Sequence, residues 1–376
     1  MREVVVLGAG LHRYGAFPEK TVMKMGAEAI RNALKDGNIP WEDIEVGYCG
    51  TARGSMSAGH FICRDLGLSG IGITNVENAS ASGSAAFREA FLAVASGAND
   101  TAIAIGADKL PKKPKKKKDK KDDGDSKKKK SKSVSFGPMQ IFARVAKQHM
   151  KKYGTTSDQL AQVSVKSHYN ASLNPYAHFQ EAVTLEQVHD ARMVADPLTV
   201  MHCCPWDDGG AAAIVCTKDI AEKYTDKICP EVTASVLKST ISGIDPMSGL
   251  TEVTANIAYE KAGIGPEDLD LVEMHDAFTI EEVIYCEALG LCEEGKGGLL
   301  AEEGVTALDG EHPVNSSGGL ISMGHPLGPT GVGQVAEILW QMRGECGERQ
   351  IKKPVDIAMA HMVGAGGVCV IHLFKK

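Results

Sequence analysis

"AIRNALKDGNIPWEDIEVGYCG", residues 29–50, and "IAYEKAGIGPEDLDLVEMHDAF", residues 257–278, follow the same order along the chain. Each stretch starts as an amphipathic helix, passes through a short loop and an acidic turn, and ends in an apolar strand. A glycine-rich turn and a further helix follow each of them. This weak repeat predicts two halves of similar topology, packed about a pseudo-twofold axis with a site between them. Chance similarity of two βα units is the alternative interpretation.

Apolar strands alternate with amphipathic helices along the rest of the chain. Nearly continuous apolar strands of this kind are typical of sheets that helices cover on both faces, so an α/β fold is expected. The sequence predicts strands at residues 4–10, 101–108, 211–216, 269–275 and 368–374, and helices at residues 20–37, 84–97, 137–154 and 156–172, the last opened by a Ser or Thr cap.

A lysine-rich segment interrupts the first half. Residues 112–132 hold 13 lysines and four aspartates, a local charge of +9 in a chain of net charge −7, so the remainder carries −16. Such a segment buries too little apolar surface to offset its ordering entropy, and we expect it to be disordered or weakly ordered. As a cationic arm it would suit the phosphates of a nucleotide-bearing cofactor or an acidic partner. Nucleic acid fits poorly, because the run has no aromatic residue for stacking.

The composition bounds the class of protein. With 376 residues, of which 43% are hydrophobic, the chain can bury a substantial core. It shows no signal-peptide pattern and no apolar run long enough to span a membrane, so a cytoplasmic protein is expected. Its ten cysteines include no CxxC pair, which favours free thiols and argues against a zinc site made by this chain alone.

The stretch "NASASGS", residues 78–84, places Ser80 in a turn between a strand-like run and an apolar helix. At a helix N-terminus the positive end of the dipole favours a developing anion, and neighbouring backbone N–H groups can form an oxyanion hole. Ser80 is therefore a candidate nucleophile. A serine that only caps the helix is the more ordinary alternative.

His275 opens the motif "HDAF" directly after an apolar strand. At a strand end its ring can hold a water or a carbonyl oxygen by hydrogen bond, and Asp276 can orient a neighbour. A structural histidine that is bonded by backbone groups is the alternative.

Two glycine-rich stretches follow towards the C-terminus. His325 lies in "NSSGGLISMGHPLGPTG", residues 315–331, a rigid loop that suits a general base. "AHMVGAGG", residues 360–367, predicts a further turn, in which the Gly364 N–H can donate to an oxyanion and His361 can reach the site.

These motifs resemble those of the thiolase superfamily, and within it the sterol-carrier-protein-2-type thiolases. The blocks that carry the resemblance are "WDDGGAAAIVC", "VEMHDAFTIEEVIYCEALGLCEEGKGG" and "NSSGGLISMGHPLGPTG", and it extends over the chain apart from the lysine-rich insertion. It implies a thiolase fold of two βαβαβαββ halves in five layers. The first half would comprise residues 1–110 and 191–230. Residues 111–190 would form an inserted loop domain that covers coenzyme A, and residues 231–376 would form the second half.

The resemblance also implies roles for the candidate residues. Residue 80 would carry the acyl group, with His325 as its base. His275 and His325 would form an oxyanion hole for the thioester oxygen, and the N–H groups of residue 80 and Gly364 a second one. His361 would be a further catalytic residue. The substrate-binding residues would be Asn315, Met362 and Phe278.

The chain departs from the family pattern at two cysteines. Members carry their nucleophile in a Cys-x-Ser motif whose cysteine matches Ser80, and a second cysteine at the position of Ala277 or Met362. Ser80 is then either an engineered replacement that traps a bound thioester, or natural in a protein with different chemistry. Without the second cysteine, His361, His275 or water would handle the proton of the α-carbon.

The function implied is thiolytic cleavage or Claisen formation of a 3-oxoacyl-CoA, with a bulky or substituted acyl chain such as an aromatic or sterol-derived one. A retro-aldolase acting on a 3-hydroxyacyl-CoA and a non-catalytic acyl-CoA or lipid-binding protein are the alternatives. Coenzyme A would be a substrate, with no other cofactor and no metal. The expected partners are a second copy of the chain and a small zinc-binding OB-fold subunit, with no nucleic acid and no membrane.

Overall fold

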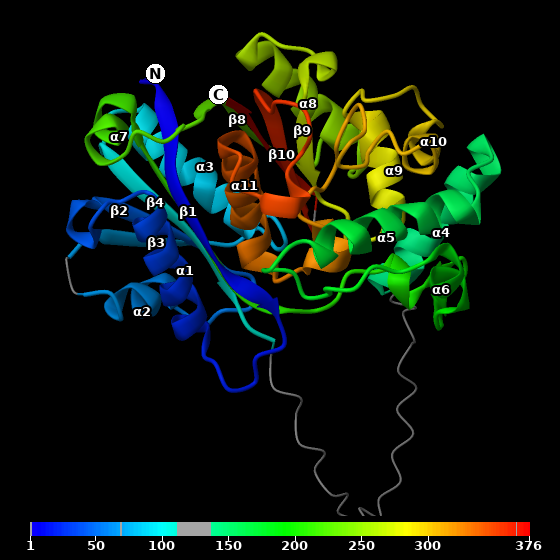
Figure 1. Ribbon diagram of the computed structural model, residues 1–376, viewed down its shortest axis with the longest axis horizontal. Helices are drawn as coiled ribbons and strands as arrows, with labels where there is room; N and C mark the ends of the chain where they lie inside the picture. The colour runs from blue at the N-terminus through cyan, green and yellow to red at the C-terminus, as the bar shows by residue number, and fades with distance from the viewer. Residues whose placement is uncertain (1, 68–69, 111–136, 366) are drawn as a thin grey trace, which may run out of the picture.

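Nine strands form one mixed sheet that passes through both halves of the molecule (Figure 1). The structure is a computed structural model and describes residues 2–67, 70–110, 137–365 and 367–376. The strand order is β3-β2-β4-β7-β1-β8-β11-β10-β9, and the two halves meet where Val5 of β1 pairs with Glu231 of β8. The strands are β1 (Val4–Gly15), β2 (Val46–Gly50), β3 (Gly72–Val76), β4 (Thr101–Asp108), β7 (Asp208–Thr217), β8 (Glu231–Ser239), β9 (Leu271–Met274), β10 (Ile357–Gly364) and β11 (Val368–Lys375). A separate ribbon joins β5 (Met193–Ala195) to β6 (Leu198–Thr199).

Helices cover both faces of the sheet and fill the space between its halves. Helix α3 (Ser82–Ala95) packs on β2 and β4, α11 (Leu327–Arg343) packs on β1, β4 and β7, and both also touch strands of the second half. Helices α1 (Val22–Asp36) and α2 (Ala58–Arg64) cover the outer face of the first half. Helix α8 (Ser248–Ala262) covers that of the second, and α9 (Thr279–Ala288) packs beside α8. This gives the five layers of a thiolase fold. Since α11 lies in the middle layer, it is buried on nearly every side.

The internal repeat is confirmed by the structure. In the first copy, α1 is followed by a 3-10 turn (Trp41–Asp43) and β2; in the second, α8 is followed by a 3-10 turn (Pro266–Asp268) and β9. Each of these strands lies parallel to the strand beside it, β2 to β4 and β9 to β10. The sequence predictions for strands at residues 4–10, 101–108 and 368–374 also agree with β1, β4 and β11.

The second half differs from the first by one strand. Where β3 pairs with β2 over five residues, β9 has on that side a single parallel bridge, between Val272 and Val314. Pro313 has no N–H to continue the pairing, and Asn315 adopts a left-handed backbone with φ 56°. The chain therefore leaves the sheet immediately, and the loop that carries His325 starts there.

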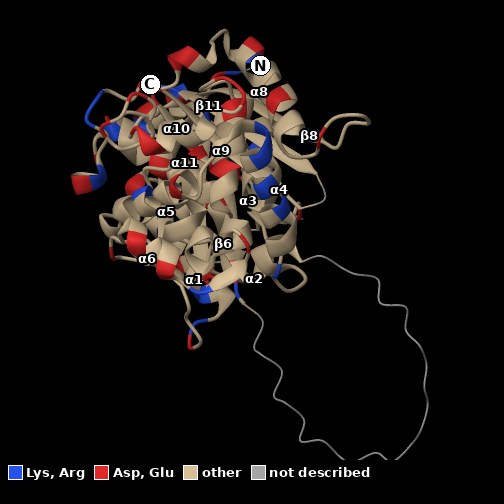
Figure 2. Ribbon diagram, turned by 90° about the vertical axis from the view of Figure 1, so that its right-hand side faces the viewer, with Lys and Arg blue, Asp and Glu red and all other residues tan. Residues whose placement is uncertain are grey.

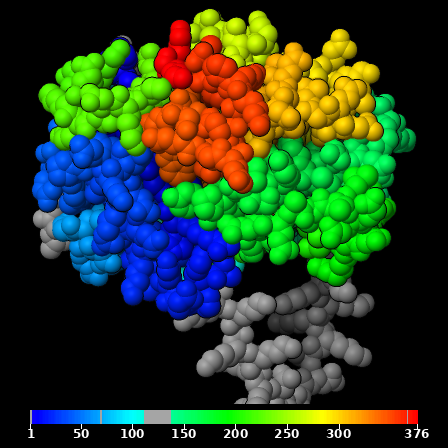
Figure 3. All heavy atoms as spheres, in the orientation of Figure 1, coloured from blue at the N-terminus to red at the C-terminus, as the bar shows by residue number. Residues whose placement is uncertain are grey.

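The inserted segment packs against the second half (Figure 3). It contains α4 (Pro138–Tyr153), α5 (Ser157–Ser172) and α6 (Leu185–Asp190), and α5 packs against α9, α10 (Gly297–Glu302) and the π-helical turn η4 (Gly319–Met323). Thr156 caps α5, as the sequence predicts, and the structure adds a capping box with Gln159. The lysine-rich run 112–132 lies outside the described residues. The remaining short elements are the 3-10 turn Val200–His202, α7 (Lys218–Tyr224) and the 3-10 turn Gly347–Arg349.

Acidic and basic residues are interspersed along the ribbon (Figure 2). The largest apolar core surrounds α3 and α11 and includes Phe87, Val332, Leu339 and Phe374. None of the helices within the described residues is long and apolar enough to cross a membrane. The turns at the ends of these central helices carry the candidate site.

Candidate active site

Ser80 lies in a tight turn between β3 and α3. Ala79 adopts a left-handed backbone with φ 50°, and the Ser82 hydroxyl accepts a hydrogen bond from Asn78 N at 2.9 Å and donates one to Ala79 O at 2.6 Å. The N-cap of α3 is Ala81, so Ser80 does not cap the helix and the capping interpretation is wrong. Its Oγ instead lies 3.0 Å from His325 Nε2.

His325 is held in a fixed orientation by the loop that precedes α11. Its backbone N–H donates to Asp207 Oδ2 at 3.2 Å, and its Nδ1 lies 2.9 Å from Thr330 Oγ1. The Thr330 hydroxyl gives its own proton to Pro326 O at 2.7 Å. Thr330 can therefore only accept from His325, so Nδ1 carries the ring proton and Nε2 offers a lone pair to Ser80.

The environment of His325 favours the neutral ring. Burial lowers its pKa well below the usual range, and the nearby charges of His275 and Arg53 lower it further. A neutral imidazole whose free lone pair faces a hydroxyl is the arrangement of a general base and its nucleophile.

His275 stands at the end of β9 and meets His325 edge to face, with ring centroids 5.5 Å apart. Its Nδ1 lies 3.1 Å from Glu281 Oε1, and the other oxygen of this carboxylate accepts a hydrogen bond from Phe278 N at 3.0 Å. The carboxylate can only accept, so Nδ1 is the donor in this hydrogen bond. The Nε2 atom is buried and has no partner among the described residues. An oxygen of a bound molecule could satisfy it.

Gly364, the last residue of β10, packs against the turn that carries Ser80. A Cβ at this position would lie only 2.3 Å from Asn78 O. Only glycine allows this close approach. The end of β10 thus reaches the cavity wall beside residue 80.

These groups line a cavity of about 630 Å³. Its wall is mostly apolar, and the rings of Phe142 in α4 and Phe278 stack there with centroids 4.3 Å apart. The Arg53 guanidinium stacks on Trp206 at 4.1 Å and contributes a positive charge to the wall. The wall includes Ser80, Pro138, Met139, Ile141, Phe142, Cys203, Cys204, Trp206, Met247, His275, Phe278, Tyr285, His325 and Gly364.

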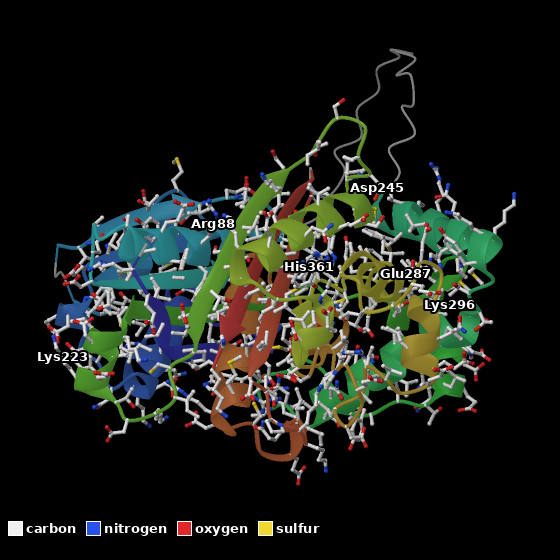
Figure 4. All side chains as sticks on the ribbon, turned by 90° about the horizontal axis from the view of Figure 1, so that it is seen from above. Arg88, Lys223, Asp245, Glu287, Lys296 and His361 are labelled. Carbon is white, nitrogen blue, oxygen red and sulfur yellow. The ribbon has the colours of Figure 1, made fainter. Side chains whose placement is uncertain are left out.

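Three residues that the sequence assigned to the site do not line this cavity. His361 is fully buried at the centre of the molecule, 3.0 Å from Thr251 Oγ1 and edge to face with Tyr285 (Figure 4). Met362 packs in a small apolar cluster, and Asn315 accepts a hydrogen bond from Met274 N at 2.8 Å. Asn315 therefore shapes the two loops that carry the histidines, and His361 lies behind the cavity wall.

Several residues at the site were not found from the sequence. Glu281 and Thr330 set the orientations of the two histidines, and Asp207 fixes the His325 backbone. Asp276, expected to orient a neighbour, accepts from Leu320 N at 2.6 Å and so holds the glycine-rich loop. Glu281 follows His275 by six residues, and this spacing is the sequence signal for their pairing. A glutamate in the first turn of a helix is, however, usually interpreted as part of a capping box. No cluster of three or more potential metal ligands occurs in the part of the chain that the structure describes.

Comparison with known proteins agrees with this architecture. The family model "Thiolase, N-terminal domain" matches residues 4–219 and "Thiolase C-terminal domain-like" matches residues 235–372. Acetyl-CoA acetyltransferase of Methanothermobacter thermautotrophicus is 39% identical over 100% of both chains. Sterol carrier protein 2 of Bos taurus is 37% identical over 99% of this chain and 72% of its own. Benzoylsuccinyl-CoA thiolase subunit BbsB of Thauera aromatica is 35% identical over 97% of this chain and 95% of its own.

Solved structures show the same fold at lower identity. The Ltp2-ChsH2(DUF35) aldolase matches with a TM-score of 0.83 and 20% identity over 99% of this chain and 98% of that one. Human mitochondrial 3-ketoacyl-CoA thiolase matches with a TM-score of 0.75 and 18% identity over 100% and 99%.

Proposed function

The chain belongs to the thiolase family, and we propose that it cleaves the Cα–Cβ bond of a 3-oxoacyl-CoA by thiolysis, or forms that bond by Claisen condensation. The observation that carries the proposal is the 3.0 Å contact between Ser80 Oγ and His325 Nε2, in a cavity wall that also holds His275. A hydroxyl beside a neutral base of fixed tautomer is an activated nucleophile.

The cleavage proceeds in two stages. His325 Nε2 takes the hydroxyl proton as Ser80 Oγ attacks the 3-oxo carbon, and the N–H groups of residue 80 and Gly364 stabilise the oxyanion that forms. The Cα–Cβ bond then breaks, and its electron pair moves into the enolate of the departing thioester. The oxygen of this enolate is stabilised by His275 Nε2, with His325 beside it. The thiol of coenzyme A attacks the Ser80 ester and releases the second acyl-CoA.

The acyl chain that the cavity suits is bulky or substituted, for example aromatic. The stacked Phe142 and Phe278 and the ring of Trp206 are aromatic parts of the cavity wall. Aromatic walls of this kind favour ring-bearing ligands through offset or edge contacts. A volume of about 630 Å³ also exceeds the needs of a two-carbon acyl group.

A second reaction is favoured by the serine itself. A hydroxyl is a weaker nucleophile than a thiolate, and the same neutral His325 could instead deprotonate the hydroxyl of a 3-hydroxyacyl-CoA. Collapse of that alkoxide breaks the Cα–Cβ bond without an acyl-enzyme. The aldolase among the structural neighbours lends this retro-aldol reaction support at the level of the fold. A binding protein without activity has no use for two histidines of fixed orientation.

Partners are proposed from the relatives. One relative is a thiolase subunit, and one structural neighbour is the Ltp2-ChsH2(DUF35) aldolase, whose name joins two components. We expect this chain to form a homodimer and to bind a small zinc-binding OB-fold subunit, in the cytoplasm, with coenzyme A as substrate and no further cofactor. Size-exclusion chromatography of the purified chain, alone and mixed with a small zinc-binding OB-fold subunit, tests this expectation.

Intact-protein mass spectrometry tests the chemistry. The native chain and its Ser80→Cys, Ser80→Ala and His325→Ala variants are incubated with 3-oxoacyl-CoA and acyl-CoA thioesters of increasing bulk. We expect an acyl adduct on the native chain, none on Ser80→Ala, and formation on His325→Ala slower by about 100-fold or more. An adduct on Ser80→Cys alone would mean that the serine disables a thiolase site.

Two other outcomes would refute the thiolase reaction. Release of an aldehyde or ketone from a 3-hydroxyacyl-CoA, with no adduct on any variant, identifies a lyase. Tight binding without turnover of either substrate class identifies a binding protein.

A further inference from the structure

The cavity contains a thiol that the reaction as proposed does not use. Cys203 and Cys204 both line it, but Cys203 Sγ is engaged with Thr199 O at 3.5 Å. Cys204 Sγ makes no hydrogen bond within the described ranges 2–67, 70–110, 137–365 and 367–376, and all ten cysteines of the chain are free thiols. Cys204 is thus an unengaged thiol in the wall that holds both histidines.

The backbone fixes Cys204 between the two histidine loops. Its N–H donates to Ala277 O at 2.8 Å, two residues after His275. Three residues further on, Asp207 accepts from the His325 backbone at 3.2 Å. Ala277 is the position where the family pattern places a second cysteine, and Cys204 is hydrogen-bonded to that residue's backbone. A thiol is therefore supplied to this part of the cavity from a different segment of the chain.

A second observation marks this place as a ligand site. His275 lines the same cavity and is only 6% exposed. Its Nε2 atom is buried and has no hydrogen-bond partner among the described residues. An enolate oxygen on His275 would place the α-carbon two bonds away, inside the cavity that Cys204 also lines. Buried polar atoms are almost always satisfied, so a ligand oxygen at Nε2 is the expected partner.

The chemistry requires an acid at this point. Thiolysis and retro-aldol cleavage both leave a carbanion at the α-carbon, which must take a proton. His325 already holds the proton of the attacking or departing oxygen, and His361 lies outside the cavity wall. Burial raises the pKa of Cys204 well above its usual range, and the carboxylates of Glu281 and Asp276 raise it further. The thiol therefore keeps its proton at neutral pH.

We propose that Cys204 is the acid that protonates the α-carbon after the Cα–Cβ bond breaks. The S–H bond breaks, the enolate electron pair forms the new C–H bond, and a thiolate remains. In thiolysis that thiolate takes the proton of the incoming coenzyme A thiol; in the retro-aldol reaction it takes the proton that His325 received from the 3-hydroxyl. This assignment rests on the proposed cleavage of a Cα–Cβ bond and holds for either version of it.

Hydrogen exchange at the α-carbon tests the assignment without requiring a complete turnover. Acetyl-CoA, propionyl-CoA and phenylacetyl-CoA are incubated with the protein in D₂O, and deuterium at the α-carbon is followed by mass spectrometry. The native chain should catalyse exchange, and Cys204→Ala should lose it by about 100-fold or more. Cys229→Ala, which removes a thiol outside the cavity, should exchange at the native rate.

Folding and function are separated by further measurements. Cys204→Ala and Cys204→Ser should bind acyl-CoA with unchanged affinity and unfold at the native temperature, which shows that the cavity is intact. Native exchange in Cys204→Ala, or an equal loss in Cys203→Ser, overturns the assignment while the proposed function stands. Absence of exchange and of cleavage in the native chain with every thioester overturns both.

Discussion

Replacing Thr330 with valine should disable His325 as a base while leaving substrate binding intact. Thr330 Oγ1 accepts from His325 Nδ1 at 2.9 Å and donates to Pro326 O at 2.7 Å. Valine keeps the shape of the side chain but has no acceptor. The Nδ1–H would then be buried without a partner, which costs about 1–3 kcal/mol.

The imidazole avoids this cost by moving its proton to Nε2, which faces Ser80. In that tautomer the ring cannot accept the hydroxyl proton. A bias of about 1–3 kcal/mol lowers the population of the base-competent tautomer by roughly 5- to 150-fold, and kcat should fall by the same factor. KM should change little, because Thr330 does not line the cavity.

Two measurements check this prediction. Steady-state cleavage of a 3-oxoacyl-CoA gives kcat and KM, and ¹⁵N NMR of the His325 ring reports the tautomer whatever the turnover rate. Thr330→Ser retains the hydroxyl and should behave like the native chain in both. If Thr330→Val keeps the native ring signals and kcat, or if Thr330→Ser is equally impaired, Thr330 does not set the tautomer.

Three further changes test the surroundings of the site. Glu281→Gln removes the charged partner of His275 Nδ1. Because a charge-assisted hydrogen bond contributes about 1.5–3 kcal/mol, kcat should fall tenfold or more while KM changes little. Steady-state kinetics at neutral pH measure both constants. Gly364→Ala puts a Cβ 2.3 Å from Asn78 O, so it should displace the Ser80 turn, lower the free energy of unfolding by about 1–3 kcal/mol and reduce adduct formation at residue 80. Burial lowers the pKa of His372 to about 3, whereas its unfolded-state pKa is 6.5. The free energy of unfolding should therefore fall as the pH drops below 6.5, by about 2 kcal/mol between pH 6.5 and 5. Denaturant unfolding of His372→Asn should not show this pH-dependent loss of stability.

The fold was predictable wherever the local pattern repeats. The helix, acidic turn and strand of residues 29–50 recur at residues 257–278 because each unit must bury one apolar helix face against a strand of the sheet. Strand β10 was not foreseen, since the glycines of residues 360–367 indicate a turn and hide the strand that ends at Gly364. The reduced third strand of the second half follows from Pro313 and a left-handed Asn315, and the latter conformation is not readable from residue type alone.

Only those site residues that lie in distinctive glycine-rich or small-residue stretches could be predicted from the sequence. Ser80 and His325 stand out because glycines and small residues surround them, whereas Glu281 and Thr330 occupy ordinary positions near the starts of α9 and α11. Their roles depend on what tertiary packing brings beside them. His361 was expected at the site because of its motif, but it does not line the cavity. It lies on the same face of β10 as the cavity-lining Val363, two residues or roughly 6.6 Å deeper along the strand, where Tyr285 covers it.

Ser80 and Cys204 divide the proposed chemistry according to their surroundings. Ser80 has a neutral base 3.0 Å away and the N-terminus of α3 beside it, both of which favour loss of its proton during attack. Cys204 has no such base among its described contacts, and burial beside carboxylates keeps its thiol protonated. The reverse assignment fails on both counts, because a hydroxyl is too weak an acid to protonate carbon readily and a thiol held in its protonated form is a poor nucleophile. The proposed roles of nucleophile and carbon acid therefore follow from the position of each side chain in the fold. The proposal that Cys204 supplies the thiol chemistry makes a serine at residue 80 compatible with catalysis.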